Sequence, residues 1–428
     1  MARVDSAKKF YSYCNRVFDI DQWFAHLNDR RKDPKYALGK IVLALGVGFV
    51  VGLDSMERLA KCIERGNFKA ILGNKAFSAD TIARGLSCTD FDELRLIYDD
   101  VLHKARNGKM LINDTVDGFK VVAIDGLTLY STKSERLGQH SHYRRDAHGE
   151  ETKLAHYYEN AVAIATVGEH DAMHLVYRFD RIPKGKGETT AAMVAIKELY
   201  KEHPGYCDFV TVDAGYAKAP ILNLIGSQNK WFVVRVKQEA YNIIKDADGL
   251  FACQEPACRF TNMQLRDGTK YWYDVEIWED EDFTSWEALK MPLRCLKVRE
   301  VRKTRDRTGK YHEEAVVETH LVTNAPMVSV MAKTIWKIAH LRWDVENNVI
   351  NTLKNAWNLK HAFSYDCDVA QKVWEIAVLF YNLFQCFTHR NLRQLKQEAK
   401  RHIRDSIFET LIIWSSKYGS LSPLANTG

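Results

Sequence analysis

Two apolar segments of this chain each end in an aspartate and a glycine. The first reads FKVVAIDG and contains Asp125, and the second reads FVTVDAG and contains Asp213. A short apolar run bounded by turn residues is typical of a buried strand. Further strand and helix patterns lie between and after these two runs. The alternation predicts an α/β fold in which helices pack on a mixed sheet.

The region from 119 to 237 carries the full pattern of such a sheet. Three more apolar stretches after Asp125 predict strands, and an amphipathic stretch predicts a helix before Asp213. Another helix and a last strand follow. The strands are expected at 127–134, 160–168 and 173–182, the first helix at 189–203, and the second helix and last strand at 217–225 and 231–237.

The flanking regions follow other periodicities. The N-terminal part is helical, with Ser55 and Ser78 placed to cap two helices. Two short helices joined by a turn suit DNA binding, but they suit a small helical bundle equally well. The predicted organisation is a helical N-terminal domain at 1–112, the first part of the core at 113–237, an inserted β-rich subdomain at 238–326, a core helix at 327–369 and a helical C-terminal region at 370–428.

Composition excludes several classes of protein. Hydrophobic residues make up 46% and charged residues 27% of the 428 residues, as in ordinary globular chains and unlike disordered ones. The net charge of +6 is too small to argue strongly for nucleic acid. Nine cysteines without a CxxC pair indicate free thiols in a reducing cytoplasm. The longest apolar run, 41–53, is shorter than the roughly 20 residues of a membrane helix, so no membrane segment is expected.

The two aspartates and a later glutamate are candidate ligands of one cation. If the strands that end at Asp125 and Asp213 are neighbours, their carboxylates lie at one edge of the sheet, although Asp-Gly is also ordinary turn chemistry. Glu346 lies in a helix expected from 328 to 357, at the edge of its apolar stripe. A carboxylate there needs a metal or a positive side chain. An Arg342–Glu346 pair along the helix would also satisfy it.

In combination, these segments resemble the DDE transposases of bacterial insertion sequences, and most closely the insertion-sequence-four family. The signature of that family on the last core helix is Tyr-x2-Arg-x3-Glu-x6-Lys. Arg342 and Glu346 match it within RWDVE, Lys354 comes one residue later than the strict spacing, and Ala339 stands at the tyrosine position. The separations of 88 residues from Asp125 to Asp213 and 133 residues from Asp213 to Glu346 also fit.

The resemblance implies an RNase H-like mixed sheet with the β-rich subdomain inserted before the glutamate. It implies that Asp125, Asp213 and Glu346 hold two Mg²⁺ (or Mn²⁺) ions, and that Arg342 and Lys354 contact DNA phosphates. The expected function is cut-and-paste DNA transposition. The implied partners are transposon-end DNA, target DNA and a second copy of the chain in the DNA complex, in a bacterial cytoplasm and at the nucleoid when DNA is bound.

Two other functions stay open from sequence, as do the roles of two basic regions. An RNase H-like nuclease without strand transfer would use the same acids, and an inactive DNA-binding descendant would use none of them. Arg305 and Arg307 lie in a basic hairpin that either contacts DNA or is simply solvated. The C-terminal helices carry basic residues that suit DNA, a second subunit or solvent: His389, Arg390, Arg393, Lys396, Lys400, Arg401 and Arg404.

Overall fold

The computed structural model describes most of the chain in ten segments. These are 5–112, 114–133, 140–145, 148, 150–169, 172–237, 242–266, 269–306, 310–390 and 400–421. The N-terminal helices are α1 (Ser6–Phe18), α2 (Ile20–Ala25), α3 (Leu38–Val50), α4 (Met56–Glu64), α5 (Lys69–Leu72), α6 (Ala79–Ser87) and α7 (Phe91–Asn107). The central elements are β1 (Val121–Thr132), β2 (His140–Arg145), β3 (Glu151–Val167), β4 (Val176–Arg181), α8 (Glu188–Glu202), β5 (Phe209–Val212), η2 (Ala214–Tyr216), α9 (Ala219–Ser227) and β6 (Trp231–Val236).

The remaining elements form a β-rich block and the C-terminal helices. The block contains α10 (Asn242–Phe251), β7 (Cys258–Arg266), β8 (Thr269–Phe283), β9 (Leu293–Arg305) and β10 (Tyr311–Thr323). The helices are α11 (Ala332–Leu341), η3 (Val345–Ile350), η4 (Thr352–Ala356), α12 (Cys367–Arg390) and α13 (Lys400–Lys417). The mixed α/β class predicted from sequence is therefore confirmed.

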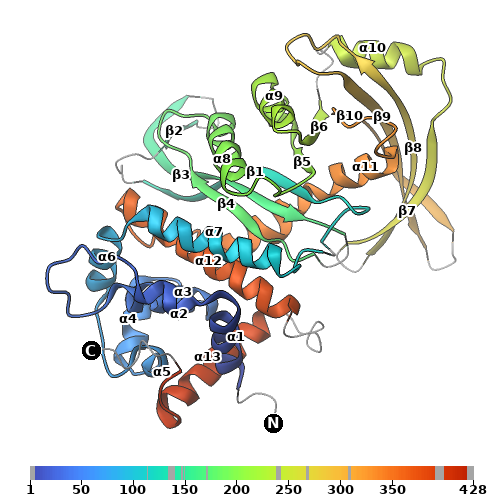
Figure 1. Ribbon diagram of the computed structural model, residues 1–428. Coiled ribbons are helices and arrows are strands. Elements are labelled where there is room, and N and C mark those ends of the chain that lie inside the picture. The colour runs from blue at the N-terminus through green and yellow to red at the C-terminus, as the bar shows by residue number, and fades with distance from the viewer. Residues whose placement is uncertain are drawn as a thin grey trace.

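One ten-stranded mixed sheet runs through the molecule in the order β2-β3-β1-β5-β6-β10-β9-β8-β7, with β4 also paired to β3. Strands β1, β5 and β6 are parallel to one another, and the other neighbours are antiparallel. Because β10 pairs with β6, the β-rich block continues the central sheet. In Figure 1 this block curves away at the upper right with α10 on its outer side.

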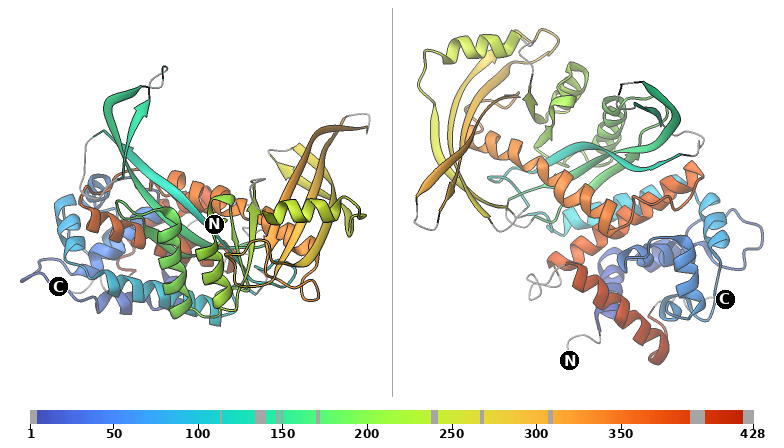
Figure 2. Two further views of the ribbon diagram at one scale, coloured as in Figure 1. Left: turned by 90° about the horizontal axis from the view of Figure 1, so that it is seen from above. Right: turned by 180° about the vertical axis from the view of Figure 1, so that it is seen from behind.

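Helices cover the central strands on both faces. Figure 2 shows α8 and α9 on one side, and α11 and the helices that follow it on the other. The strand segment 121–124 and the whole of β5 are buried, as is expected of strands covered on both faces. Two sequence predictions for helix starts are confirmed, since Ser55 and Ser78 accept hydrogen bonds from the backbone N–H groups of Arg58 and Thr81.

The helical body is built around α3 and α12. Every residue of α3 is buried, and α3 takes up most of the long apolar run at 41–53. Gly46 lets α12 approach closely, because a Cβ atom there would lie 2.0 Å from the ring of Phe380. Within the described part of the chain, no helix is long and apolar enough to cross a membrane.

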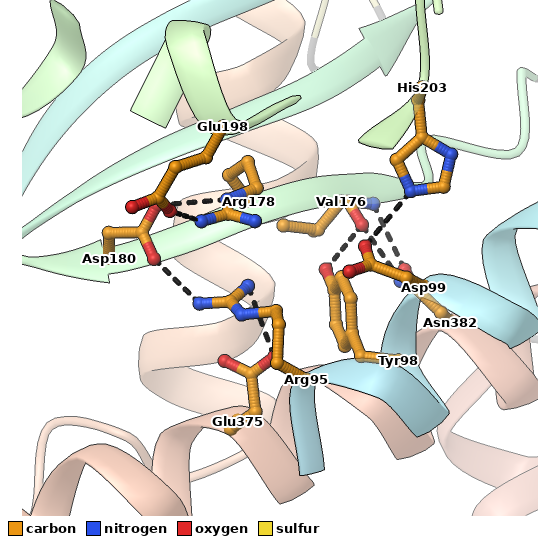
Figure 3. Close-up of polar contacts among 10 residues, drawn as sticks. All are labelled: Arg95, Tyr98, Asp99, Val176, Arg178, Asp180, Glu198, His203, Glu375 and Asn382. Carbon is orange, nitrogen blue, oxygen red and sulfur yellow. Dashed lines mark hydrogen bonds and ion pairs between the residues drawn. The ribbon is translucent and has the colours of Figure 1, made fainter. Parts of the chain in front are cut away.

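A polar network joins the helical body to β4, as Figure 3 shows. Arg95 of α7 contacts Asp180 at 2.7 Å and the fully buried Glu375 of α12 at 3.1 Å. The side-chain amide of Asn382 donates to the backbone carbonyl of Val176 and accepts from its N–H, at 2.8 and 2.9 Å. Asn382 thus satisfies backbone groups of β4 that lack a strand partner, and it protects this edge of the sheet.

The C-terminal helix returns to the N-terminal helices. Thr410 of α13 accepts a hydrogen bond from the backbone of Ala7 at 2.9 Å, and Ser415 accepts one from Ala70 at 3.0 Å. Arg404 corrects a sequence expectation, because it faces neither DNA nor solvent. It is buried and donates to the carbonyls of Phe49, Val50 and Ala356.

Two predicted elements differ from those observed. The segments 119–126 and 127–134 were expected as two strands, but β1 runs through both of them because Asp125 and Gly126 stay extended and paired with β3. The helix expected from 328 begins four residues later, at Ala332, and its winding changes to π-type at Val345. The predicted hairpin between β9 and β10 is confirmed by their antiparallel register, which pairs Arg305 with Tyr311.

Candidate active site

The two aspartates are positioned by neighbouring parallel strands. In the pair of β1 and β5, Ala123 is opposite Thr211. Asp125 lies two residues further along β1, and Asp213 follows directly after the end of β5. Both line one cavity.

Backbone N–H groups orient both carboxylates. Asp125 Oδ1 accepts from the N–H of Gly126 at 3.0 Å. Asp213 Oδ1 accepts from Gly215 at 2.8 Å and from Tyr216 at 3.3 Å, and in this way caps η2. The Asp-x-Gly turn chemistry considered from sequence is therefore present at Asp213, and it leaves the second carboxylate oxygen for other partners.

Glu346 lies in η3, the first π-type turn of the helical segment that follows α11. Its neighbours Val345 and Val349 are fully buried, whereas Glu346 is half-buried at the edge of the core. A π-turn closes i→i+5 bonds and so holds one residue more than an α-turn, and such turns are frequent at functional sites. Lys354 comes one residue later than the family signature places it. The π-type winding takes up this extra residue, and Lys354 lines the same cavity.

The cavity, of about 590 Å³, brings together five of the seven catalytic and DNA-binding residues predicted from sequence. It lies between the middle of β1, the end of β5, the faces of β6, β9 and β10, and the helical segment from α11 to η4. The five are Asp125, Asp213, Glu346, Arg342 and Lys354. Ala339, at the tyrosine position of the signature, also lines it.

The electrostatics of the cavity centre on Asp125. Burial, together with the negative charges of Asp213, Glu346 and Glu188, raises the pKa of Asp125 to about 6, although Arg342 opposes the shift. Arg342 Nη1 lies 3.6 Å from Asp125 Oδ2, and its guanidinium stacks over Trp343 at 4.6 Å. Arg342 therefore pairs with Asp125 of β1. The alternative considered from sequence was a pair with Glu346 on its own helix.

The donor set suits a hard divalent cation. Carboxylate oxygens are the ligands that Mg²⁺ prefers, and the negative charges of Asp213, Glu346 and Glu188 all act on Asp125. Among the described residues, no three His, Cys, Asp or Glu side chains are already drawn together in a metal-binding cluster. The carboxylates line the cavity from three separate elements, with Arg342 as the counter-charge beside Asp125.

Other cavity residues were not found from sequence. Arg235 and Lys237 project from β6 as positive charges. Their signal was the alternating WFVVRVK, which was interpreted only as a strand. Between α11 and β9, His340 Nε2 contacts Glu300 Oε1 at 2.8 Å. Burial acts to raise the pKa of Glu300, but hydrogen bonds from His340 and Trp336 outweigh it and lower this pKa.

The basic hairpin lies apart from the cavity. Arg305 ends β9, is exposed and stacks over Tyr311 at 5.5 Å, and Arg307 falls outside the described residues. Several cations of the hairpin pair with acids on neighbouring strands. Lys303 contacts Asp274 at 2.7 Å, and Arg302 contacts Glu314 at 3.1 Å. The positive charge of the hairpin is therefore smaller than the sequence alone suggests.

Comparison with known proteins identifies the family. A family model described as the transposase DDE domain matches residues 120–383, which is more than half of the chain and includes all three acids. The chain belongs to the DDE transposase family. This transposase is therefore an enzyme of DNA transposition, as predicted from sequence.

Curated proteins and solved structures give two further comparisons. The search of curated proteins found no match. Among solved structures, a similar chain is the piggyBac transposase in a synaptic complex with hairpin DNA. It shares 13% sequence identity with this transposase at a TM-score of 0.41, and the alignment covers 97% of this chain and 81% of that one.

Proposed function

We propose that this transposase cuts DNA at transposon ends and joins the released ends to target DNA, with Asp125, Asp213 and Glu346 as its metal ligands. The observation that carries the proposal is the single cavity into which three separate elements bring three acids, two of them on adjacent parallel strands. In such a site, two divalent ions would activate the attacking oxygen and stabilise the leaving oxygen. Mg²⁺ and Mn²⁺ both suit carboxylate ligands.

We also propose a finer family membership, which the strand order supports. The run β4-β3-β1-β5-β6 has two antiparallel pairs and then two parallel pairs, which supports an RNase H-like core at 113–237 and 327–369. The β-rich block between β6 and α11 supports the insertion-sequence-four group and the proposed subdomain at 238–326. That group belongs to bacterial insertion sequences, which supports a place in the bacterial cytoplasm and at the nucleoid.

Positive side chains around the cavity support binding of a DNA backbone. Arg342 and Lys354 line it from the helix, and Arg235 and Lys237 line it from β6. Arg guanidinium groups suit bidentate phosphate contacts, and Lys provides a point charge. We propose that Arg342, which lies beside Asp125, contacts a phosphate of the bound DNA. The partners are transposon-end DNA and target DNA, with two copies of the chain in the complex.

One assay separates this proposal from the two alternatives. Full-length protein is incubated with labelled transposon-end DNA, a target plasmid and Mg²⁺. Cleavage followed by joining supports the transposase reaction, cleavage alone supports a nuclease, and binding without cleavage supports an inactive DNA-binding protein. Asp213→Asn and Glu346→Gln should abolish cleavage and spare end binding. The control is Glu202→Gln, at the far end of α8, which should cut like the wild type.

A further inference from the structure

A fourth carboxylate lies next to the site, on the sheet face opposite Glu346 (Figure 2). Glu188 is the first residue of α8, and its side chain lies directly on Gly126, the residue after Asp125. A Cβ atom at position 126 would lie 2.0 Å from Glu188 Cδ and 2.1 Å from Oε2. Glycine at 126 therefore leaves the space that the Glu188 carboxyl occupies.

A buried phenol independently marks the same place. Tyr216 follows Asp213 in η2 and is only 1% exposed, and its hydroxyl has no hydrogen bond of regular geometry to any described side chain or backbone group. The charge of Glu188 acts on this hydroxyl more strongly than those of Asp125 and Asp213, and the Glu188 carboxyl lies within hydrogen-bonding reach of it. Tyr216 is thus an O–H donor beside the carboxylates. Leaving such a donor unsatisfied costs about 1–3 kcal/mol, so the site must supply an acceptor.

We propose that Glu188 is a fourth carboxylate of this metal site and shares one divalent cation with Asp125, while the hydroxyl of Tyr216 holds it in place. This inference rests on the proposed function, since it requires Asp125 to be a metal ligand. Glu188 is exposed, so its side chain can turn toward an incoming ion. Its charge acts on Asp125. A carboxylate supported by a hydroxyl donor is a usual arrangement around bound metals.

The test measures Mn²⁺ binding rather than catalysis. Full-length wild type, Glu188→Gln, Gly126→Ala and Glu202→Gln are titrated with Mn²⁺ and followed by electron paramagnetic resonance, with and without end DNA. Glu188→Gln should weaken one of two bound ions by about 10-fold, as expected for loss of one supporting ligand. Gly126→Ala should do the same, because it displaces the carboxyl without removing it. Glu202→Gln should bind like the wild type.

The outcomes distinguish this inference from the proposed function. If Asp125→Asn loses Mn²⁺ while Glu188→Gln binds like the wild type, the three-acid site stands and the role of Glu188 is wrong. If Asp125→Asn also binds Mn²⁺ like the wild type, the metal assignment itself fails. Tyr216→Phe gives a second check: it should weaken the same ion as Glu188→Gln, and equal binding of both ions would overturn the positioning role of the phenol.

Discussion

Replacing Asp125 with asparagine should stabilise the metal-free transposase at neutral pH. The folded state holds the pKa of Asp125 at about 6, above its ordinary value of 3.8, chiefly through burial. Between these two values the unfolded chain has lost the proton and the folded protein retains it, so stability falls as pH rises through this window. Above pH 6 the loss is constant. Two pKa units correspond to about 3 kcal/mol, and at pH 5 the loss is about half of that.

Asparagine removes this loss but also removes a partner of Arg342. The Arg342–Asp125 contact is long, at 3.6 Å, and the Arg342 side chain is 12% exposed. This attraction already acts on the pKa of Asp125, so its loss is contained in the shift and is not subtracted again. The net expectation for Asp125→Asn is therefore a gain of about 3 kcal/mol at pH 8 and about half of that at pH 5.

Thermal unfolding in EDTA at pH 5 and pH 8 measures this difference, with Asp246→Asn on α10 as an exposed control. Added Mg²⁺ should then reverse the order of stability, because a ligand that binds only the folded wild type raises its melting temperature. The reasoning is refuted if Asp125→Asn melts below the wild type at pH 8 in EDTA. It is equally refuted if Mg²⁺ stabilises both proteins alike.

Three further changes test separate parts of the molecule. Lys354→Ala should lower the slope of log affinity against log salt for end DNA by about 0.9, as loss of one phosphate contact requires; fluorescence anisotropy at several salt concentrations checks this, and an unchanged slope excludes the contact. Arg305→Glu combined with Arg307→Glu should weaken end binding at low salt while Mn²⁺ binding persists, whereas unchanged affinity would make the hairpin a solvated loop. Gly46→Ala should destabilise the fold by about 1–3 kcal/mol in urea unfolding, because its methyl group overlaps the ring of Phe380. Phe380→Leu should relieve part of that cost, and a Gly46→Ala protein as stable as the wild type would contradict the close packing.

Features that depend on a few neighbouring residues could be predicted from the sequence. The strands before Asp125 and Asp213, the caps at Ser55 and Ser78 and the hairpin between β9 and β10 all follow from local periodicity and turn chemistry. The ordered set of two aspartates after apolar runs and a helical glutamate also pointed to one site, although Asp125 lies within β1 and not at its end.

Contacts between distant segments were decided only by the tertiary structure. Arg342 pairs with Asp125 rather than along its own helix, and Arg404 turns inward to carbonyls at the end of α3. Glu188 packs on Gly126, which lies on a strand more than 60 residues earlier in the sequence. A sequence pattern specifies which residues share a face of one element. It does not specify which element packs against that face, because that choice depends on the burial and charge of the whole assembled core.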